Sequence, residues 1–127
     1  MLRLPTSNQI IAIVDDDLSV LRGLTRLLNN LHFKTEVFSS AEAFLQRPES
    51  SEVSCVVLDI HLGGMSGIEA RRRLSARGST VPIIFMTALD SAAVRKEAIE
   101  VGCAAFLPKP FSGNELLNAI RNATALS

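Results

Sequence analysis

Five side chains with useful chemistry stand at the ends of stretches that are predicted to be β-strands. Asp15 and Asp16 end the first stretch and Asp59 ends the third, while Thr87 and Lys109 end the fourth and fifth. Carboxylate oxygens without a nearby His or Cys pair suit Mg²⁺ or Mn²⁺. A metal, a hydroxyl and an ammonium group are what a transferring phosphoryl group needs around its oxygens. If the fold brings these residues together, they predict a metal-dependent phosphoryl site.

Asp59 is the candidate nucleophile of this site. It stands alone at the end of a central apolar strand, with Asp15 and Asp16 expected on one side and Thr87 and Lys109 on the other. Three crowded carboxylates repel one another, so such a cluster either holds protons or recruits a cation. A carboxylate can also form a covalent aspartyl-phosphate. The predicted chemistry is therefore phosphorylation of Asp59.

Each motif also has an ordinary structural interpretation. The pair Asp15 and Asp16 alone could form a turn, and Lys109 with Pro110 could form a surface turn. Asp17 is predicted to cap the helix that follows it. The three arginines 71–73 indicate a solvated helix face, with a partner-binding patch as the alternative. The chemical interpretation rests on suitable residues at four separate strand ends.

Strands and helices alternate along the chain, and this pattern must position the five side chains. Apolar, β-branched runs predict strands at 10–14, 35–38, 55–58, 83–86 and 104–107. Three S-x-x-E patterns predict capped helix starts at Ser39/Glu42, Ser66/Glu69 and Ser112/Glu115. The alternation predicts a doubly wound α/β fold, a parallel sheet with helices on both faces. In such a fold the carboxyl ends of the strands meet at one edge.

Length and composition exclude several classes of protein. The chain has 127 residues, 47% of them hydrophobic, which predicts one domain with its own core. Lys+Arg and Asp+Glu both number 13, which does not favour a nucleic-acid binder, and no apolar run approaches a membrane span. We expect a flexible leader at residues 1–9, a domain at 10–127, and reduced Cys55 and Cys103 in a cytoplasmic protein.

The sequence resembles the receiver domain of two-component response regulators from Gln9 to the last helix. The stretches that carry this resemblance are Ile13–Asp17, Val57–Asp59, Met65–Gly67, Phe85–Ala88 and Phe106–Phe111. The resemblance implies a flavodoxin-like (βα)5 fold with a five-stranded parallel sheet of order 2-1-3-4-5. It also implies a signalling domain rather than an enzyme.

The resemblance assigns roles to the residues of the predicted site. Asp59 would accept a phosphoryl group from a phosphohistidine on a sensor histidine kinase or phosphotransfer protein. Asp16 and Asp59 would bind Mg²⁺ directly, Asp15 mainly through water, and the backbone carbonyl of His61 would be the third protein ligand. Lys109 would pair with the phosphoryl oxygens.

A conformational switch is the second implication of the resemblance. Thr87 and Phe106 match the hydroxyl–aromatic switch pair, and their movement would repack the surface formed by roughly residues 90–125. The bond between Lys109 and Pro110 is expected to be cis. The chain has Leu62-Gly63 where similar receivers often have Met-Pro, and glycine gives that loop more conformational freedom.

Two other functions are compatible with the residues. A Mg²⁺-dependent phosphohydrolase could use Asp59, but it usually needs a second acid two residues later, where this chain has His61. A phosphate-independent interaction module would not need the intact set of five residues. A receiver could also be joined to an output or DNA-binding domain in a longer chain. The domain itself is expected to bind neither nucleic acid nor membrane.

Overall fold

The computed structural model describes residues 9–48 and 52–125, which form five strands and five helices. The strands are β1 (Ile10–Val14), β2 (Lys34–Phe38), β3 (Cys55–Asp59), β4 (Ile83–Thr87) and β5 (Ala105–Pro108). The helices are α1 (Leu18–Asn30), α2 (Ala41–Leu45), α3 (Gly67–Ala76), α4 (Ala92–Val101) and α5 (Gly113–Thr124). Each strand lies within one or two residues of its predicted range.

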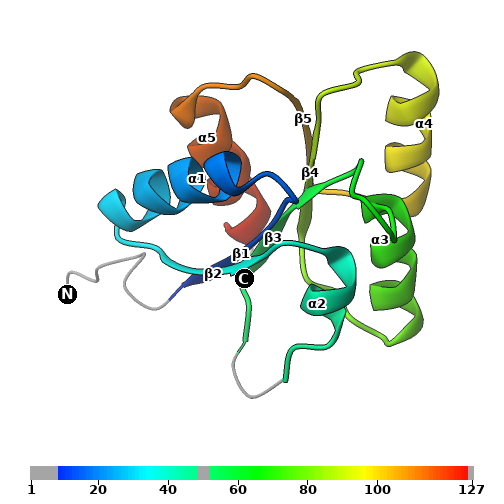
Figure 1. The fold of residues 1–127 in the computed structure, drawn as a ribbon, viewed down its shortest axis with the longest axis horizontal. Helices are drawn as coiled ribbons and strands as arrows, with labels where there is room; N and C mark the ends of the chain where they lie inside the picture. Colours follow the sequence, from blue (N-terminus) through cyan, green and yellow to red (C-terminus); the bar gives the residue numbers. More distant parts are fainter. Residues whose placement is uncertain (1–8, 49–51, 126–127) are drawn as a thin grey trace.

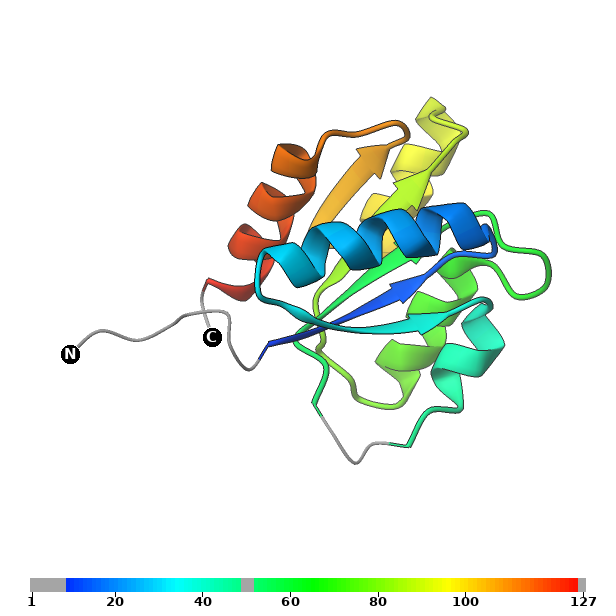
Figure 2. The ribbon, with the colours of Figure 1, turned by 60° about the vertical axis from the view of Figure 1, so that its left-hand side comes forward.

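The five strands form one parallel sheet in the order β2-β1-β3-β4-β5. Helices α1 and α5 cover one face of the sheet, and α2, α3 and α4 cover the other (Figure 1). This arrangement confirms the predicted doubly wound fold and its strand order. All five arrowheads point toward the same edge of the sheet (Figure 2), so the strand ends that carry the candidate residues lie together.

Alternate residues of each strand enter two separate cores. In β3, Val56 and Leu58 pack on the side of α2, α3 and α4, while Cys55 and Val57 pack on the side of α1 and α5. Every residue of β3 and β4 is buried, because helices cover both faces of the sheet at its centre. The site residues at the ends of these strands are therefore attached to the most rigidly packed part of the fold.

Side chains cap the helices, though not always as predicted. Asp17 caps α1, and Ser112 with Glu115 forms the complete capping box of α5. The predicted box at Ser39 and Glu42 is wrong: the cap of α2 is Ser40, whose hydroxyl accepts from Ala43 N at 3.0 Å. Glu42 consequently lies in the first turn of α2 instead of completing a box with Ser39, and its carboxylate also accepts a bond from outside the helix.

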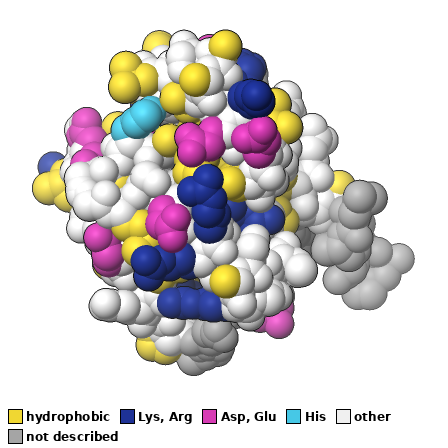
Figure 3. All heavy atoms as spheres, turned by 90° about the vertical axis from the view of Figure 1, so that its right-hand side faces the viewer, with side chains coloured by type: hydrophobic (Ala, Val, Ile, Leu, Met, Phe, Trp, Pro, Cys, Tyr) yellow, Lys and Arg dark blue, Asp and Glu magenta, His cyan; other side chains and the backbone are white. Residues whose placement is uncertain are grey.

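The three arginines of α3 lie on a surface with charges of both signs, as the face carrying α3 and α4 shows (Figure 3). Glu69 caps no backbone group that the structure records; its carboxylate pairs with Arg72 at 3.6 Å and Arg73 at 3.2 Å. Arg72 also reaches Glu97 of α4 at 3.6 Å. The pairs of Arg72 and Arg73 fit the interpretation of a solvated helix face. Arg71 departs from it, because it is half-buried and its Nε donates to Gly102 O at 2.8 Å.

The proposed leader mostly lies outside the described residues, since only Gln9 of residues 1–9 is described. Gln9 already belongs to the sheet region, because its carbonyl accepts a hydrogen bond from Lys34 N at 3.0 Å. Among the described residues, no helix combines the length and the apolar character needed to cross a bilayer.

Candidate functional site

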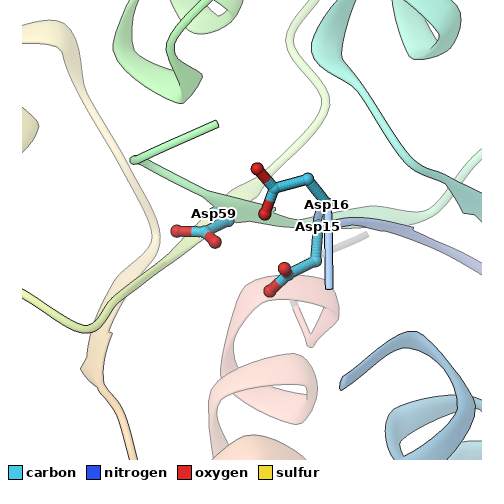
Figure 4. Close-up of side chains that lie close together, drawn as sticks. All are labelled: Asp15, Asp16 and Asp59. Atoms are coloured by element: carbon cyan, nitrogen blue, oxygen red, sulfur yellow. The ribbon is translucent and has the colours of Figure 1, made fainter. Parts of the chain in front are cut away.

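The carboxylates of Asp15, Asp16 and Asp59 meet at the carboxyl edge of the sheet. One oxygen from each lies within 4.8 Å of the others. Asp15 and Asp16 follow β1 and Asp59 ends the adjacent β3, so two neighbouring strands supply the cluster (Figure 4). Asp15 and Asp59 are buried, whereas Asp16 is exposed. The three side chains predicted to form an acidic cluster thus lie together at the carboxyl edge of the sheet.

Lys109, which follows the edge strand β5, reaches this cluster with its ammonium group. Its Nζ donates to Asp15 Oδ2 at 2.7 Å and to Asp59 Oδ2 at 3.2 Å. The loop after β5 places it there, and its backbone N–H donates to Thr87 O at 2.7 Å. The bond between Lys109 and Pro110 is cis, as predicted. A lysine 50 residues from Asp59 in the chain therefore lies within hydrogen-bond distance of its carboxylate.

Burial and neighbouring charges shift the pKa values of Asp59 and Lys109. Burial raises the pKa of Asp59, and the nearby charge of Asp15 raises it further, while Lys109 counteracts both effects in part. Burial acts to lower the pKa of Lys109, but the hydrogen bond to Asp15 and the two carboxylate charges outweigh it and raise the pKa. Lys109 therefore stays cationic, and the cluster retains surplus negative charge that a bound cation would stabilise.

Thr87 ends β4, where its carbonyl bonds Lys109 N, and Phe106 lies on the neighbouring β5 opposite Phe85. Thr87 is fully buried, and its hydroxyl exchanges hydrogen bonds with the backbone of Leu89, accepting at 3.0 Å and donating at 3.2 Å. Phe106 is half-buried, and the Arg95 guanidinium lies 4.8 Å from the centre of its ring. No sequence pattern points to Arg95, which also pairs with Asp90 at 2.8 Å.

The loop between β3 and α3 closes over the acidic cluster. His61 N donates to Asp59 Oδ1 at 3.1 Å, and Gly63 N donates to Asp16 Oδ2 at 3.2 Å. Gly67 N donates to Ile60 O at 2.9 Å, and a β-carbon at position 67 would overlap the carbonyl oxygen of Asp59. The glycines of this loop thus allow close backbone packing, and one of them supplies an N–H that a proline could not.

Glu42 is a residue near the site that the sequence analysis placed in a cap instead. Its Oε2 accepts a hydrogen bond from Met65 N at 3.0 Å, across 23 residues of sequence. That backbone bond is the main cause of the lowered pKa of Glu42. No sequence pattern connects residues so far apart, so only the fold reveals this contact.

The donor set matches what a hard divalent cation prefers. The side chains of Asp15, Asp16 and Asp59 offer only carboxylate oxygens. The loop that directly follows Asp59 adds backbone carbonyl oxygens, which are also suitable ligands. Mg²⁺ typically binds through one or two carboxylates together with water and phosphate oxygens. The arrangement of acids, Lys109 and Thr87 is suited to binding a metal ion and a phosphoryl group side by side.

Known proteins with the same features were found by sequence and by structure. The family model described as "Response regulator receiver domain" matches residues 11–121. The response regulator protein TodT of Pseudomonas putida is 38% identical over 118 residues, which are 93% of this chain and 52% of TodT. The transcriptional regulatory protein TdiR of Thauera aromatica is 39% identical over 115 residues, 91% of this chain and 51% of TdiR.

A solved structure agrees with these relatives. The crystal structure of a response regulator receiver protein from Burkholderia phymatum is 35% identical, with a TM-score of 0.81 over 94% of this chain and 97% of that chain. The chain spans about half the length of the curated relatives it matches. The similarity therefore concerns the part of those relatives that corresponds to the described fold.

Proposed function

The chain belongs to the receiver domains of response regulators, and from this premise we propose that Asp59 is its phosphoacceptor. The observation that carries the proposal is the position of Asp59, 5% exposed at the end of β3, with its carboxylate bonded to Lys109 and close to two further carboxylates. The proposed function is signalling through phosphorylation of this side chain rather than turnover of a metabolite.

The proposed reaction moves one phosphoryl group. A carboxylate oxygen of Asp59 attacks phosphorus, a P–O bond forms, and the P–N bond of a phosphohistidine breaks. The bonding electron pair stays on the leaving imidazole nitrogen. Lys109 keeps its proton and pairs with a phosphoryl oxygen. Its contacts with Asp15 and Asp59 already hold its ammonium group beside the oxygen that is phosphorylated. Mg²⁺ held by Asp15, Asp16, Asp59 and the His61 carbonyl would neutralise charge on the phosphoryl oxygens.

The phosphoryl donor would be a sensor histidine kinase or a phosphotransfer protein. An apolar groove lined by Val20, Gly23, Leu24 and Ala88 opens beside Lys109 and supports docking of a protein partner there. The regulatory relatives, which this chain spans by about half, support an output or DNA-binding domain in a longer protein. Such a regulator would act in the cytoplasm.

Exchange of Asp59 for Asn tests the acceptor directly. Wild-type protein incubated with Mg²⁺ and acetyl phosphate should form an acyl phosphate that is labile to acid and to base, and D59N should form none. The control is loss of labelling when EDTA removes the metal. Labelling of D59N at the wild-type level would rule out Asp59 as the acceptor. Rapid turnover of phosphate esters by wild-type protein would favour a phosphohydrolase instead.

The response to phosphorylation is proposed to pass through Thr87 and Phe106. Thr87 would give up its bonds to Leu89 and donate to the phosphoryl group, and Phe106 would move into the space beside it. This movement would displace the Arg95 guanidinium from the ring and repack the surface of α4, β5 and α5. To shift the two states from 1:99 to 99:1, phosphorylation must favour one state by about 5.5 kcal/mol.

Exchange of Thr87 for Ala separates phosphorylation from the switch. T87A should still form the acyl phosphate but show little change in the amide chemical shifts of α4 and β5 when phosphorylated. Wild-type protein supplies the control for the full shift pattern. If T87A shows the same phosphorylation-dependent shifts as wild type, the hydroxyl of Thr87 does not drive the switch.

A further inference from the structure

Two carboxylates from different elements hold the β3–α3 loop, residues 60–66. Asp16, which follows β1, accepts from Gly63 N at 3.2 Å. Glu42 of α2 accepts from Met65 N at 3.0 Å. The first carboxylate belongs to the acidic cluster, whereas the second does not. Together with the bond from His61 N to Asp59 Oδ1, three carboxylates thus hold the loop, and only Glu42 lies outside the candidate metal site.

Asp16 would carry out two tasks. The proposed function makes its carboxylate a metal ligand, and the same carboxylate accepts the hydrogen bond from Gly63 N, so the cation and the amide would draw on one charged group. The bond from Met65 to Glu42 carries no such conflict, because Glu42 lies outside the cluster. Glu42 is therefore the carboxylate whose bond to the loop a cation in the cluster would leave intact.

Close packing between Glu42 and the loop depends on Gly64. A β-carbon at position 64 would lie 2.7 Å from Glu42 Oε2, a distance that real side chains essentially never show. The carboxylate therefore occupies the space that any larger residue at 64 would need. A hydrogen bond from Gly64 N to Leu62 O at 3.2 Å completes the tight turn. Glu42 and Gly64 form a matched pair across the gap between α2 and the loop.

We propose that Glu42 is a positioning residue that holds the β3–α3 loop against the acidic cluster and so sets its affinity for Mg²⁺ and the rate at which Asp59 is phosphorylated. The inference rests on the proposed function of this site. Glu42 touches neither the reacting atoms nor the metal. It acts through the backbone of residues 61–65, which carries the His61 carbonyl proposed as a ligand and the N–H groups that bond Asp16 and Asp59.

Exchange of Glu42 for Ala tests this role in the whole chain. We expect E42A to bind Mg²⁺ about tenfold more weakly in calorimetric titration, at the low end for a residue that orients metal ligands because the bond is accessible to water. Phosphorylation by acetyl phosphate should slow by a similar factor at subsaturating Mg²⁺ and recover at saturating Mg²⁺. E42Q keeps an oxygen that can accept from Met65 N and should recover most of the affinity.

Glu115→Ala is the matched control. Glu115 also accepts a backbone bond at a helix start, from Ser112 N at 2.9 Å, but at α5 and away from the loop. E115A should lower the stability to urea while leaving the Mg²⁺ affinity within twofold of wild type. Equal Mg²⁺ affinity and labelling rate in E42A and wild type would overturn the inference. So would a loss in E115A as large as that in E42A.

A second pair of variants tests the packing between Glu42 and the loop. G64A should weaken Mg²⁺ binding because the new methyl group displaces the Glu42 carboxylate. In the E42A background the same exchange should cost less, because only the backbone strain of alanine at a φ of +158° remains once the displaced group is gone. Fully additive losses would contradict the pairing of these two residues.

Failure of the inference and failure of the proposed function give different results. If wild-type protein binds no Mg²⁺, or if D59N is labelled as well as wild type, the proposed function fails. If wild type binds Mg²⁺ and is labelled on Asp59 while E42A behaves identically, only the role of Glu42 fails.

Discussion

The carboxyl edge of the sheet and the outer surface of α3 and α4 both pair acids with bases, in very different surroundings. At the edge, the side chains of Asp15 and Asp59 are 1% and 7% exposed, and Lys109 joins them. On α3 and α4, the side chains of Arg72, Glu69 and Glu97 are each at least 41% exposed. The same types of charged group are thus withdrawn from water in one region and solvated in the other.

The difference in exposure determines how strongly the charged groups of each region interact. Exposed pairs gain little from their attraction, because water and salt screen them. At the sheet edge, three carboxylates share one ammonium group among the described residues, and burial strengthens both their repulsion and their attraction to Lys109. The surplus negative charge is what would draw a divalent cation, so the unbalanced cluster is the functional one.

Among variants that keep Asp59, removal of Lys109 should have the largest effect in either region. K109A leaves Asp15 and Asp59 buried without their cationic partner and removes the group proposed to bind the phosphoryl oxygens. We expect labelling of Asp59 by acetyl phosphate to fall by about 100-fold or more, as when a charge-stabilising donor is lost. Single-turnover labelling at saturating Mg²⁺ measures the effect. A rate within threefold of wild type would show that Lys109 has no part in the transfer.

Cys55 extends the comparison to a buried ionisable group that has no cationic partner among the described residues. It lies at the start of β3, fully buried, and burial raises the pKa of its thiol to about 12. The unfolded thiol ionises near 9, so stability from this group is complete below pH 9 and is lost as pH rises toward 12. Between pH 7 and pH 10.5 the loss should be about 2 kcal/mol.

The measurement is urea unfolding of wild type and C55A at both pH values. C55A removes the thiol, so its stability should fall less than that of wild type over the same interval, although it starts lower because of the smaller side chain. Equal losses in the two proteins would mean that Cys55 does not titrate on unfolding. At Asp59, at the other end of the same strand, Lys109 counteracts part of the effect of burial on the pKa, whereas for Cys55 burial is the main cause of the shift.

Arg72 should give the smallest effect. R72A removes ion pairs to Glu69 and Glu97, each 3.6 Å long and exposed. We expect the free energy of unfolding to change by less than about 0.5 kcal/mol, and the change to disappear in 1 M NaCl. Urea unfolding at low and high salt provides the measurement. A loss above 2 kcal/mol would erase the distinction between the two regions.

The sequence predicted most of the fold and the cluster because their signals are local. A buried parallel strand is a continuous apolar run, and Asp59 or Thr87 stands where the run stops. The fold then brings these ends together by rule, without any knowledge of individual contacts. The prediction for Lys109 succeeded for the same reason, although its partners are far away in sequence.

The contacts that the sequence did not predict depend on competition between partners. Ser39 and Ser40 are both acceptable caps, and only the packing of α2 selects Ser40. Glu69 satisfies the capping pattern but pairs with arginines instead. Glu42 was assigned to a local partner and instead bonds Met65 across the sheet edge. In each case several local arrangements are chemically equivalent, and tertiary structure decides between them.

Gly67 has a consequence for any effort to redesign this domain. Because even a methyl group there would strike the acceptor's own backbone carbonyl, variation at position 67 cannot be separated from movement of Asp59. Libraries that aim to change kinetics or partner choice should keep that codon fixed and diversify an exposed side chain of the loop such as His61. Gly67 thus limits which positions near Asp59 can be varied without moving its backbone.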